Sequence, residues 1–171
     1  MENQTTTTRT ALKWGVIIGI VYILFSTGIY VSGQIGNKNL SYIFYLIVGI
    51  GVYFSLTDFK KESQGYISFS QGLGLGTMMS AIVGLISSFY SFVYTKFIDP
   101  SLNQQMLRVM EQNMEKQGTP DDQIEQAMEM SKMFMNPGVV FVFGVIFIVF
   151  IGFVLSLIIS AIIKKDKPVF E

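Results

Sequence analysis

The chain has 171 residues, of which 50% are hydrophobic and only 14% are charged, and its 12 basic and 12 acidic residues give a net charge of zero. Without a basic surplus it lacks the electrostatic signature of a nucleic-acid-binding protein, so we expect no nucleic acid partner. Cysteine and histidine are both absent, which excludes disulfides, thiolate sites and the side chain that most often serves as general base or metal ligand.

The apolar residues are concentrated in long stretches. Four of these contain no Asp, Glu, Lys or Arg: residues 14–32, 40–57, 67–95 and 137–163. A helix that crosses the hydrocarbon core of a bilayer needs about 20 mainly apolar residues, whereas a helix of a soluble bundle carries charge on its outer face. We therefore predict an all-α integral membrane protein. Its single domain would cover residues 11–171 and contain four transmembrane helices, at about residues 12–32, 40–58, 69–97 and 138–163.

The N-terminal segment is read as a tail followed by an uncleaved span. Residues 1–10 are polar and include four consecutive threonines, so we expect them to be disordered. Arg9 and Lys13 precede the first apolar stretch, as basic residues do in a signal peptide. That stretch is longer than the roughly 7–15 residues of a signal-peptide core, and no A-x-A-like cleavage site follows it. We expect Trp14 to lie at the level of the lipid headgroups.

The third apolar stretch has a small residue at every fourth position. Side chains four residues apart share one face of a helix, and a face of small residues lets another membrane helix approach closely. We predict that this helix is the packing spine, through Gly72, Gly76, Ser80, Gly84 and Ser88. Its predicted partner is the fourth span, through Gly144, Gly152, Ser156 and Ser160. A phosphate-cradling loop at residues 72–76 would need a preceding strand and a Lys or Thr at set spacing, and neither is present.

Residues 101–136 differ in kind, because they carry both signs of charge and no apolar stretch long enough to span a membrane. Asp99-Pro100 is expected to end the preceding helix, since proline disfavours helix at the residue before it. Gly118-Thr119-Pro120 combines a C-terminal glycine, a threonine N-cap and a proline at the first helical position. We predict an amphipathic helical hairpin. Its apolar face would meet a partner or lipid through Met106, Met110, Met114, Ile124, Met128 and Phe134.

The distribution of basic residues predicts an orientation. With both termini in the cytoplasm, the inner side holds seven Lys and Arg residues in short segments at the helix ends. The outer side then holds Lys38 and the four basic residues of the 96–136 region. Because cytoplasmic segments carry the excess of Lys and Arg, we predict cytoplasmic termini and an extracytoplasmic hairpin.

No arrangement of side chains in the sequence predicts catalysis. Proton and ion pathways normally expose a carboxylate, His or Arg within the spans, but the polar side chains there are Ser, Thr, Tyr, Asn and Gln. Asp58 and Asp99 would lie on opposite faces of the bilayer, about 30 Å apart, so they cannot share a proton or a metal. We expect each to cap a helix. The charged turn at residues 58–62 is expected to be solvated, with lipid headgroup binding as its alternative.

The methionines are the unusual feature of the composition. Seven of the ten lie in the predicted hairpin. Thioethers can bind Cu(I), but without His or Cys ligands we favour plain hydrophobic packing. We predict no catalytic, cofactor-binding or metal site.

Several motifs resemble a known family. Gly65-Tyr66-Ile67-Ser68-Phe69-Ser70-Gln71-Gly72, then Phe97-Ile98-Asp99-Pro100 and a Met/Gln/Glu-rich helical segment, are similar to the bacterial Domain of Unknown Function 4199 family. The likeness covers nearly the whole chain, with Ser70 standing where the family is expected to have glycine. It implies four spans with a long loop before the last, in the bacterial inner membrane. It transfers no catalytic or binding residue.

Three functions remain open at this stage. We favour an accessory or scaffold protein, not an enzyme, that lies in the lipid bilayer and contacts an envelope or membrane protein, or its own copies, through the hairpin. The alternative is a small oligomeric channel or transporter for an uncharged or lipid-like solute, in a pore lined by Ser and Thr. A third is an intramembrane enzyme, which would need Asp58, Glu62 or Asp99 to act alone or together with another copy of the chain.

Overall fold

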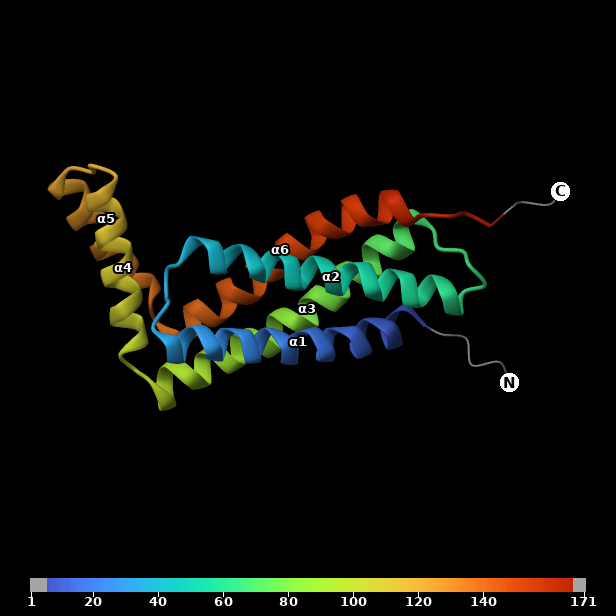
Figure 1. Cartoon of the computed structure of the whole chain (residues 1–171), viewed down its shortest axis with the longest axis horizontal. Coiled ribbons are helices and arrows are strands. Elements are labelled where there is room, and N and C mark those ends of the chain that lie inside the picture. The colour runs from blue at the N-terminus through green and yellow to red at the C-terminus, as the bar shows by residue number, and fades with distance from the viewer. Residues whose placement is uncertain (1–5, 168–171) are drawn as a thin grey trace.

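The computed structural model of the chain describes residues 6–167 (Figure 1). Its elements in chain order are α1 (Thr7–Ser32), α2 (Lys38–Glu62), α3 (Phe69–Val93), a π-helical turn (Tyr94–Ile98), α4 (Leu102–Lys116), α5 (Asp121–Phe134) and α6 (Pro137–Ile163). The α1, α2 and α6 helices, together with α3 and its π-helical extension, are long and apolar enough to cross a membrane. The prediction of an all-α membrane protein with four transmembrane helices is confirmed.

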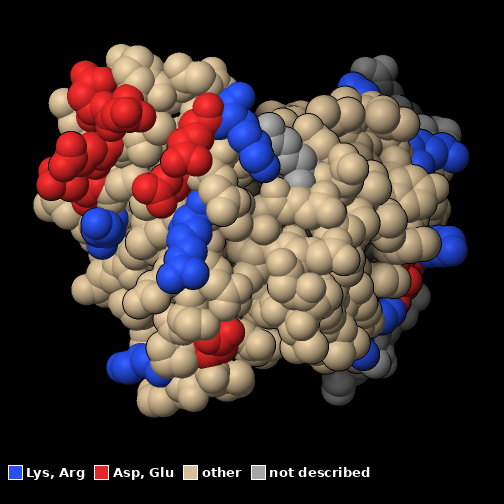
Figure 2. All heavy atoms as spheres, turned by 60° about the vertical axis from the view of Figure 1, so that its left-hand side comes forward, with Lys and Arg blue, Asp and Glu red and all other residues tan. Residues whose placement is uncertain are grey.

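The four long helices form one up-and-down bundle, in which helices consecutive in the bundle run in opposite directions and α3 lies at the centre. The α3 helix packs most extensively on α6 and α1, and less on α2. The start of α1, the α2–α3 loop and the end of α6 lie together at one end, called here the terminal end (Figure 1). The α4 and α5 helices form the hairpin, which runs across the other end, called the hairpin end. Acidic side chains gather on the hairpin, together with some Lys and Arg, and further Lys and Arg gather at the terminal end, with a broad uncharged surface between the two ends (Figure 2).

Local sequence signals explain where several helices begin. Ser68 and Gln71 form a capping box, in which the Ser68 hydroxyl accepts from the Gln71 amide and the Gln71 side chain accepts from the Ser68 amide. The Asn136 side chain caps α6 by accepting from the Gly138 amide at 3.0 Å, and Pro137 occupies the first turn, where its missing N–H costs nothing.

Two expected boundaries are corrected. The first helix begins at Thr7, inside the tail expected to be disordered, because the Thr6 side chain caps it and Thr10 is buried against the bundle. The rest of that tail, residues 1–5, lies outside the described residues. In the hairpin, α5 begins at Asp121, so Pro120 takes the N-cap position expected for Thr119.

The third span ends with a widened turn before the predicted stop at Asp99-Pro100. Its last five residues, Tyr94–Ile98, are π-helical, and the Asp99 amide donates to the Tyr94 carbonyl at 2.8 Å. The Tyr94 ring lies 4.9 Å from the ring of Tyr30 on α1, measured between centroids. The two helices are therefore joined by aromatic contact at the hairpin end.

The apolar core is concentrated toward the terminal end. Its buried members include Ala11 and Ile18 of α1, Val52, Leu56 and Phe59 of α2, and Leu75 and Met79 of α3. Large apolar side chains on the outside of the bundle are exposed, among them Leu24, Phe150 and Ile158. Such exposure suits a protein surrounded by lipid, since the hydrocarbon takes the place of a second apolar layer.

Candidate functional site

The small residues of α3 and α6 lie against one another along the whole contact between these helices. A Cβ atom added to Gly72 would lie 2.6 Å from the Ser160 Oγ, and one added to Gly144 would lie 2.7 Å from the Ser88 Oγ. Added Cβ atoms at the two middle levels would collide with serines, that of Gly76 with Ser156 and that of Gly152 with Ser80. A glycine of one helix therefore faces a serine of the other at four levels.

The fifth level explains a gap in the sequence pattern. Gly84 lies opposite Ile148, and a Cβ atom added to Gly84 would be 3.2 Å from the Val145 backbone oxygen. At this level α3 has a glycine, and α6 has the large side chain of Ile148 where the other levels have a serine or a glycine. We call this set of facing positions the seam.

Two of the four serines of the seam donate their hydroxyl hydrogen bonds within their own helix. The Ser80 hydroxyl donates to the Gly76 carbonyl at 2.9 Å, and the Ser156 hydroxyl donates to the Gly152 carbonyl at 2.6 Å. Ser160 differs, because its oxygen is buried and has no hydrogen-bond partner among the described residues. The hydroxyls of Ser80 and Ser156 thus form hydrogen bonds within their own helices and not between α3 and α6.

Charged residues tie the helices together at the terminal end. Asp58 Oδ2 accepts from Lys13 Nζ at 2.7 Å and from Trp14 Nε1 at 2.8 Å. Two residues after Asp58, Lys60 Nζ donates to the Ile163 carbonyl at the end of α6. Asp58 therefore links α1 to α2 instead of capping a helix, and the expected solvated turn is partly replaced by contacts between helices.

Asp99 acts locally at the opposite end. Its Oδ1 accepts from the Ser101 amide at 3.0 Å and from the Ser101 hydroxyl at 2.6 Å, which starts α4. Asp58 and Asp99 lie at different ends of the bundle, so they form no common site. Among the described residues, no group of three or more His, Cys, Asp or Glu side chains could hold a metal ion.

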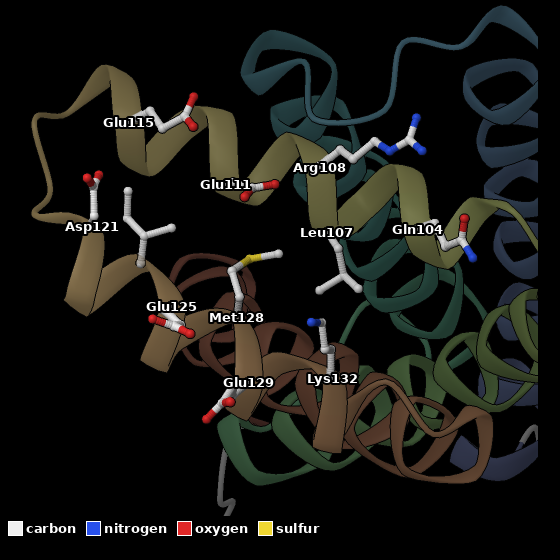
Figure 3. Close-up of a pocket in the computed structure, with 11 residues that line it drawn as sticks. Gln104, Leu107, Arg108, Glu111, Glu115, Asp121, Glu125, Met128, Glu129 and Lys132 are labelled. Carbon is white, nitrogen blue, oxygen red and sulfur yellow. The ribbon is translucent and has the colours of Figure 1, made fainter.

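A groove of about 580 Å³ lies between α4 and α5 (Figure 3). Leu107, Ile124 and Met128 give it an apolar floor. Five acids also line it: Glu111, Glu115, Asp121, Glu125 and Glu129. Glu115 and Asp121 lie toward the tip of the hairpin, whereas Lys132 lies toward its base (Figure 3). The groove thus combines an apolar strip with a negative rim.

The negative charge of the groove is not balanced at close range. Across residues 6–167, the ion pair found within 4.0 Å is that of Lys13 with Asp58, and both of these lie at the terminal end. Arg108 and Lys132 line the groove without reaching one of its acids within that distance. A cationic side chain from another molecule would therefore meet free carboxylates.

The predicted apolar face of the hairpin is divided in the structure. Ile124 and Met128 line the groove, and the Met110 sulfur accepts from the Ser131 hydroxyl at 3.3 Å across the hairpin. Met114 is half-buried, whereas Met106 and Phe134 are exposed. Phe134 also makes an edge-to-face contact with Phe143 of α6. Part of this face thus holds the two helices together, and part is free.

The acidic rim was not predicted as a site. Its members recur every four residues, at Glu111 and Glu115 on α4 and at Asp121, Glu125 and Glu129 on α5. That spacing places each row on one helical face. The spacing could have predicted a row of acids on each helix, but the sequence within either helix does not show that the two rows face a common groove.

Comparison with known proteins identifies a family for nearly the whole chain. The sequence model of a family described as protein of unknown function (DUF4199) matches residues 13–165, which include the four spans and the hairpin. Neither the curated proteins nor the solved structures contain a match. The resemblance expected from the sequence motifs is confirmed. The chain belongs to the DUF4199 family of proteins of unknown function.

Proposed function

We propose that this protein is an accessory or scaffold protein of the bacterial inner membrane, not an enzyme, and that it binds an envelope protein through the groove between α4 and α5. The observation that carries the proposal is the groove itself, which joins an apolar floor to unpaired carboxylates beyond the ends of the spans.

The chemistry of the groove defines the partner. An amphipathic helix could lay its apolar side on Leu107, Ile124 and Met128, in the manner of helix-in-groove recognition. Lys or Arg residues flanking that apolar side would meet the acidic rim. Opposite charge of this kind raises the association rate and selects the partner. The expected partner is therefore a membrane or envelope protein with a basic amphipathic segment.

The attachment of the hairpin suits presentation to a partner. Its contacts with the bundle include Val109 packed on Gly36 of the α1–α2 turn and Phe134 packed on Phe143. The α4 and α5 helices otherwise pack mainly on each other. A partner could thus bind the hairpin without disturbing the seam of α3 and α6.

The orientation rests on the position of the cations. The terminal end, opposite the hairpin, holds the start of α1, the end of α2 and the residues just after α6, and these segments contain Lys13, Lys60, Lys61, Lys164 and Lys165. The rule that cytoplasmic segments collect Lys and Arg supports the proposal that both termini lie in the cytoplasm and the hairpin lies outside. Because the chain has no cysteine, Gln117→Cys and Ser63→Cys give clean single-thiol probes. We expect a membrane-impermeant reagent added from outside to label the first only. Labelling of both from one side would overturn the threading.

Crosslinking tests the partner. A photoreactive amino acid at Glu125 should crosslink, in native membranes, to a basic and apolar segment of one protein. The same probe at Met78, which is 40% exposed on α3, is the matched control and should crosslink mainly to lipid.

Neutralising the rim tests the role of charge. Glu111→Gln combined with Glu115→Gln, in the presence of the Glu125 probe, should reduce the yield of the crosslinked product about tenfold, because close charge pairs contribute at least ~1.4 kcal/mol. Recovery of only this chain or lipid, or no effect of neutralisation, would contradict the proposal. Solute flux in proteoliposomes would then favour the channel or transporter.

A further inference from the structure

Two cavities lie next to each other in the half of the bundle nearer the hairpin. One, of about 140 Å³, lies between α1, α3 and α6, and the other, of about 110 Å³, lies between α1, α2 and α6. Tyr22, Phe147 and Ile148 line both. The two spaces therefore adjoin each other and share the side chains of Tyr22, Phe147 and Ile148 as part of their walls.

The cavities occur where the core is thinnest. Toward the terminal end, Leu56, Leu75 and Met79 fill the interior and are fully buried. Toward the hairpin end, the inner surfaces of α1 and α3 carry serines, including Ser26 and Ser88. Small hydroxyl side chains leave room that Leu or Met would fill, so the bundle is closed at one end and hollow at the other.

The length of the hollow region matches one leaflet of a bilayer. Along α6 its lining runs from Val140 to Ile151. At 1.5 Å per residue this is roughly 16 Å, close to half of the ~30 Å hydrocarbon core. The region thus extends from the membrane surface on the hairpin side to about the midplane.

The polarity of the lining changes along the same direction. Tyr30 and Ser91 bring hydroxyl groups to the surface end, whereas Val48 and Ile151 line the deep end. Of the described residues that line the two cavities, none is charged. This order, polar at the surface and apolar at depth, is that of the ester end and the chain of a membrane lipid.

The second cavity also opens to the surrounding lipid. Tyr45 of α2 and Phe147 of α6 line it and are 39% and 54% exposed on the outside of the bundle. A cavity of about 150 Å³ lined by apolar side chains is large enough to bind benzene. Together the two cavities offer room for several methylene groups, and a bilayer supplies acyl chains at the opening.

We propose that the two cavities are one binding site for an acyl chain of a phospholipid in the leaflet on the hairpin side. The chain runs through both cavities: its ester oxygens accept hydrogen bonds from hydroxyls such as those of Ser91 and Tyr30 in the first, and its end lies against Val48 and Ile151 in the second. The site holds a lipid and does not pass it across, because the packed core of the terminal half closes its deep end.

A photoreactive phospholipid tests this site. The protein is reconstituted in nanodiscs that contain phosphatidylethanolamine with a diazirine on its acyl chain, and the labelled residues are mapped by mass spectrometry. We expect labelling at Tyr22, Val48 and Ile151 to exceed labelling at Leu24 and Ile162, which are 69% and 77% exposed on the bundle surface. Equal labelling per exposed area would mean ordinary surrounding lipid and would overturn the proposal.

Two variants with opposite expected effects keep the test decisive. Val48→Phe fills the deep end and should reduce labelling at Ile151 about fivefold, because the chain loses its room. Tyr22→Ala should join the two cavities and increase the labelling at Ile151. Labelling at Ile162 should stay constant in both variants, which also reports that the bundle is intact. No change at Ile151 in Tyr22→Ala would contradict a shared site, and stronger labelling by a diazirine fatty acid than by the phospholipid would contradict the stated occupant.

Discussion

The seam of α3 and α6 and the hairpin of α4 and α5 are both antiparallel helix pairs, but they are held together by different means. In the seam, glycine faces serine, and the helices approach until an added Cβ atom would collide. In the hairpin, long side chains such as Met110 and Ile124 fill the space between the helices, and acids line a groove of about 580 Å³.

The difference follows from the surroundings of each pair. Helices in lipid gain nothing by burying leucine, since hydrocarbon is as apolar as leucine, so close contact between small residues joins them. Helices in water gain from burying apolar surface, at roughly 25 cal/mol per Å², and can present charge on their outer sides. The seam is therefore rigid and intolerant of added atoms, whereas the hairpin can keep a groove open for a partner.

The largest effect is expected when a large side chain is added to the seam. Gly76→Leu should lower the free energy of unfolding by about 3 kcal/mol, since overpacking of a tight contact costs that order of energy. Chemical unfolding in mixed micelles measures it. Gly74→Leu is the matched control on the same helix, because no atom lies within 4 Å of a Cβ added at Gly74. It should change stability by less than ~1 kcal/mol. Equal losses in both variants would show that the seam does not hold the bundle.

A second, smaller effect is expected where charges join the bundle at the terminal end. Asp58→Ala removes the acceptor for Lys13 and Trp14, and we expect a loss of about 1 to 2 kcal/mol, because charged hydrogen bonds are worth more than neutral ones but this site is partly exposed. The same unfolding assay applies, with the exposed Lys61→Ala as control. A loss as large as that of Gly76→Leu would mean that ionic contacts, and not the seam, dominate.

The hairpin should respond locally to strain at its tip. Gly118 has φ +73°, a conformation that costs a residue with a Cβ roughly 1 kcal/mol. In Gly118→Ala, hydrogen exchange should speed up at the ends of α4 and α5 while the melting temperature of the bundle stays the same. The neighbouring substitution Gln117→Ala should change neither the exchange rates nor the melting temperature. Faster exchange in α3 or α6 would show that the hairpin and the bundle unfold together.

The smallest expected effect has the opposite sign. The Ser160 hydroxyl is buried without a partner, so Ser160→Ala should stabilise the protein by about 0.5 to 1 kcal/mol, because an unsatisfied polar group is removed. Ser156→Ala, whose hydroxyl is bonded within its own helix, should be close to neutral. A clear destabilisation in Ser160→Ala would indicate that its oxygen has a role across the seam.

Much of the architecture was predictable because it depends on local rules. Charge-free stretches of sufficient length predict membrane helices, and the small residues at every fourth position from Gly72 to Ser88 predict one smooth helical face. The start of α1 at Thr7 was missed, because a run of threonines favours disorder until one of them caps a helix and another is buried.

The sequence by itself determined the spans, the hairpin and the smooth face of α3, because helix periodicity and hydrophobicity act within one segment. Only the tertiary structure decided the pairings. Asp58 meets Lys13 across 45 residues, Gly84 lies opposite Ile148, and the acids of α4 and α5 border a common groove. Each of these depends on how helices far apart in the chain are placed side by side, and that placement follows from the packing of the whole bundle.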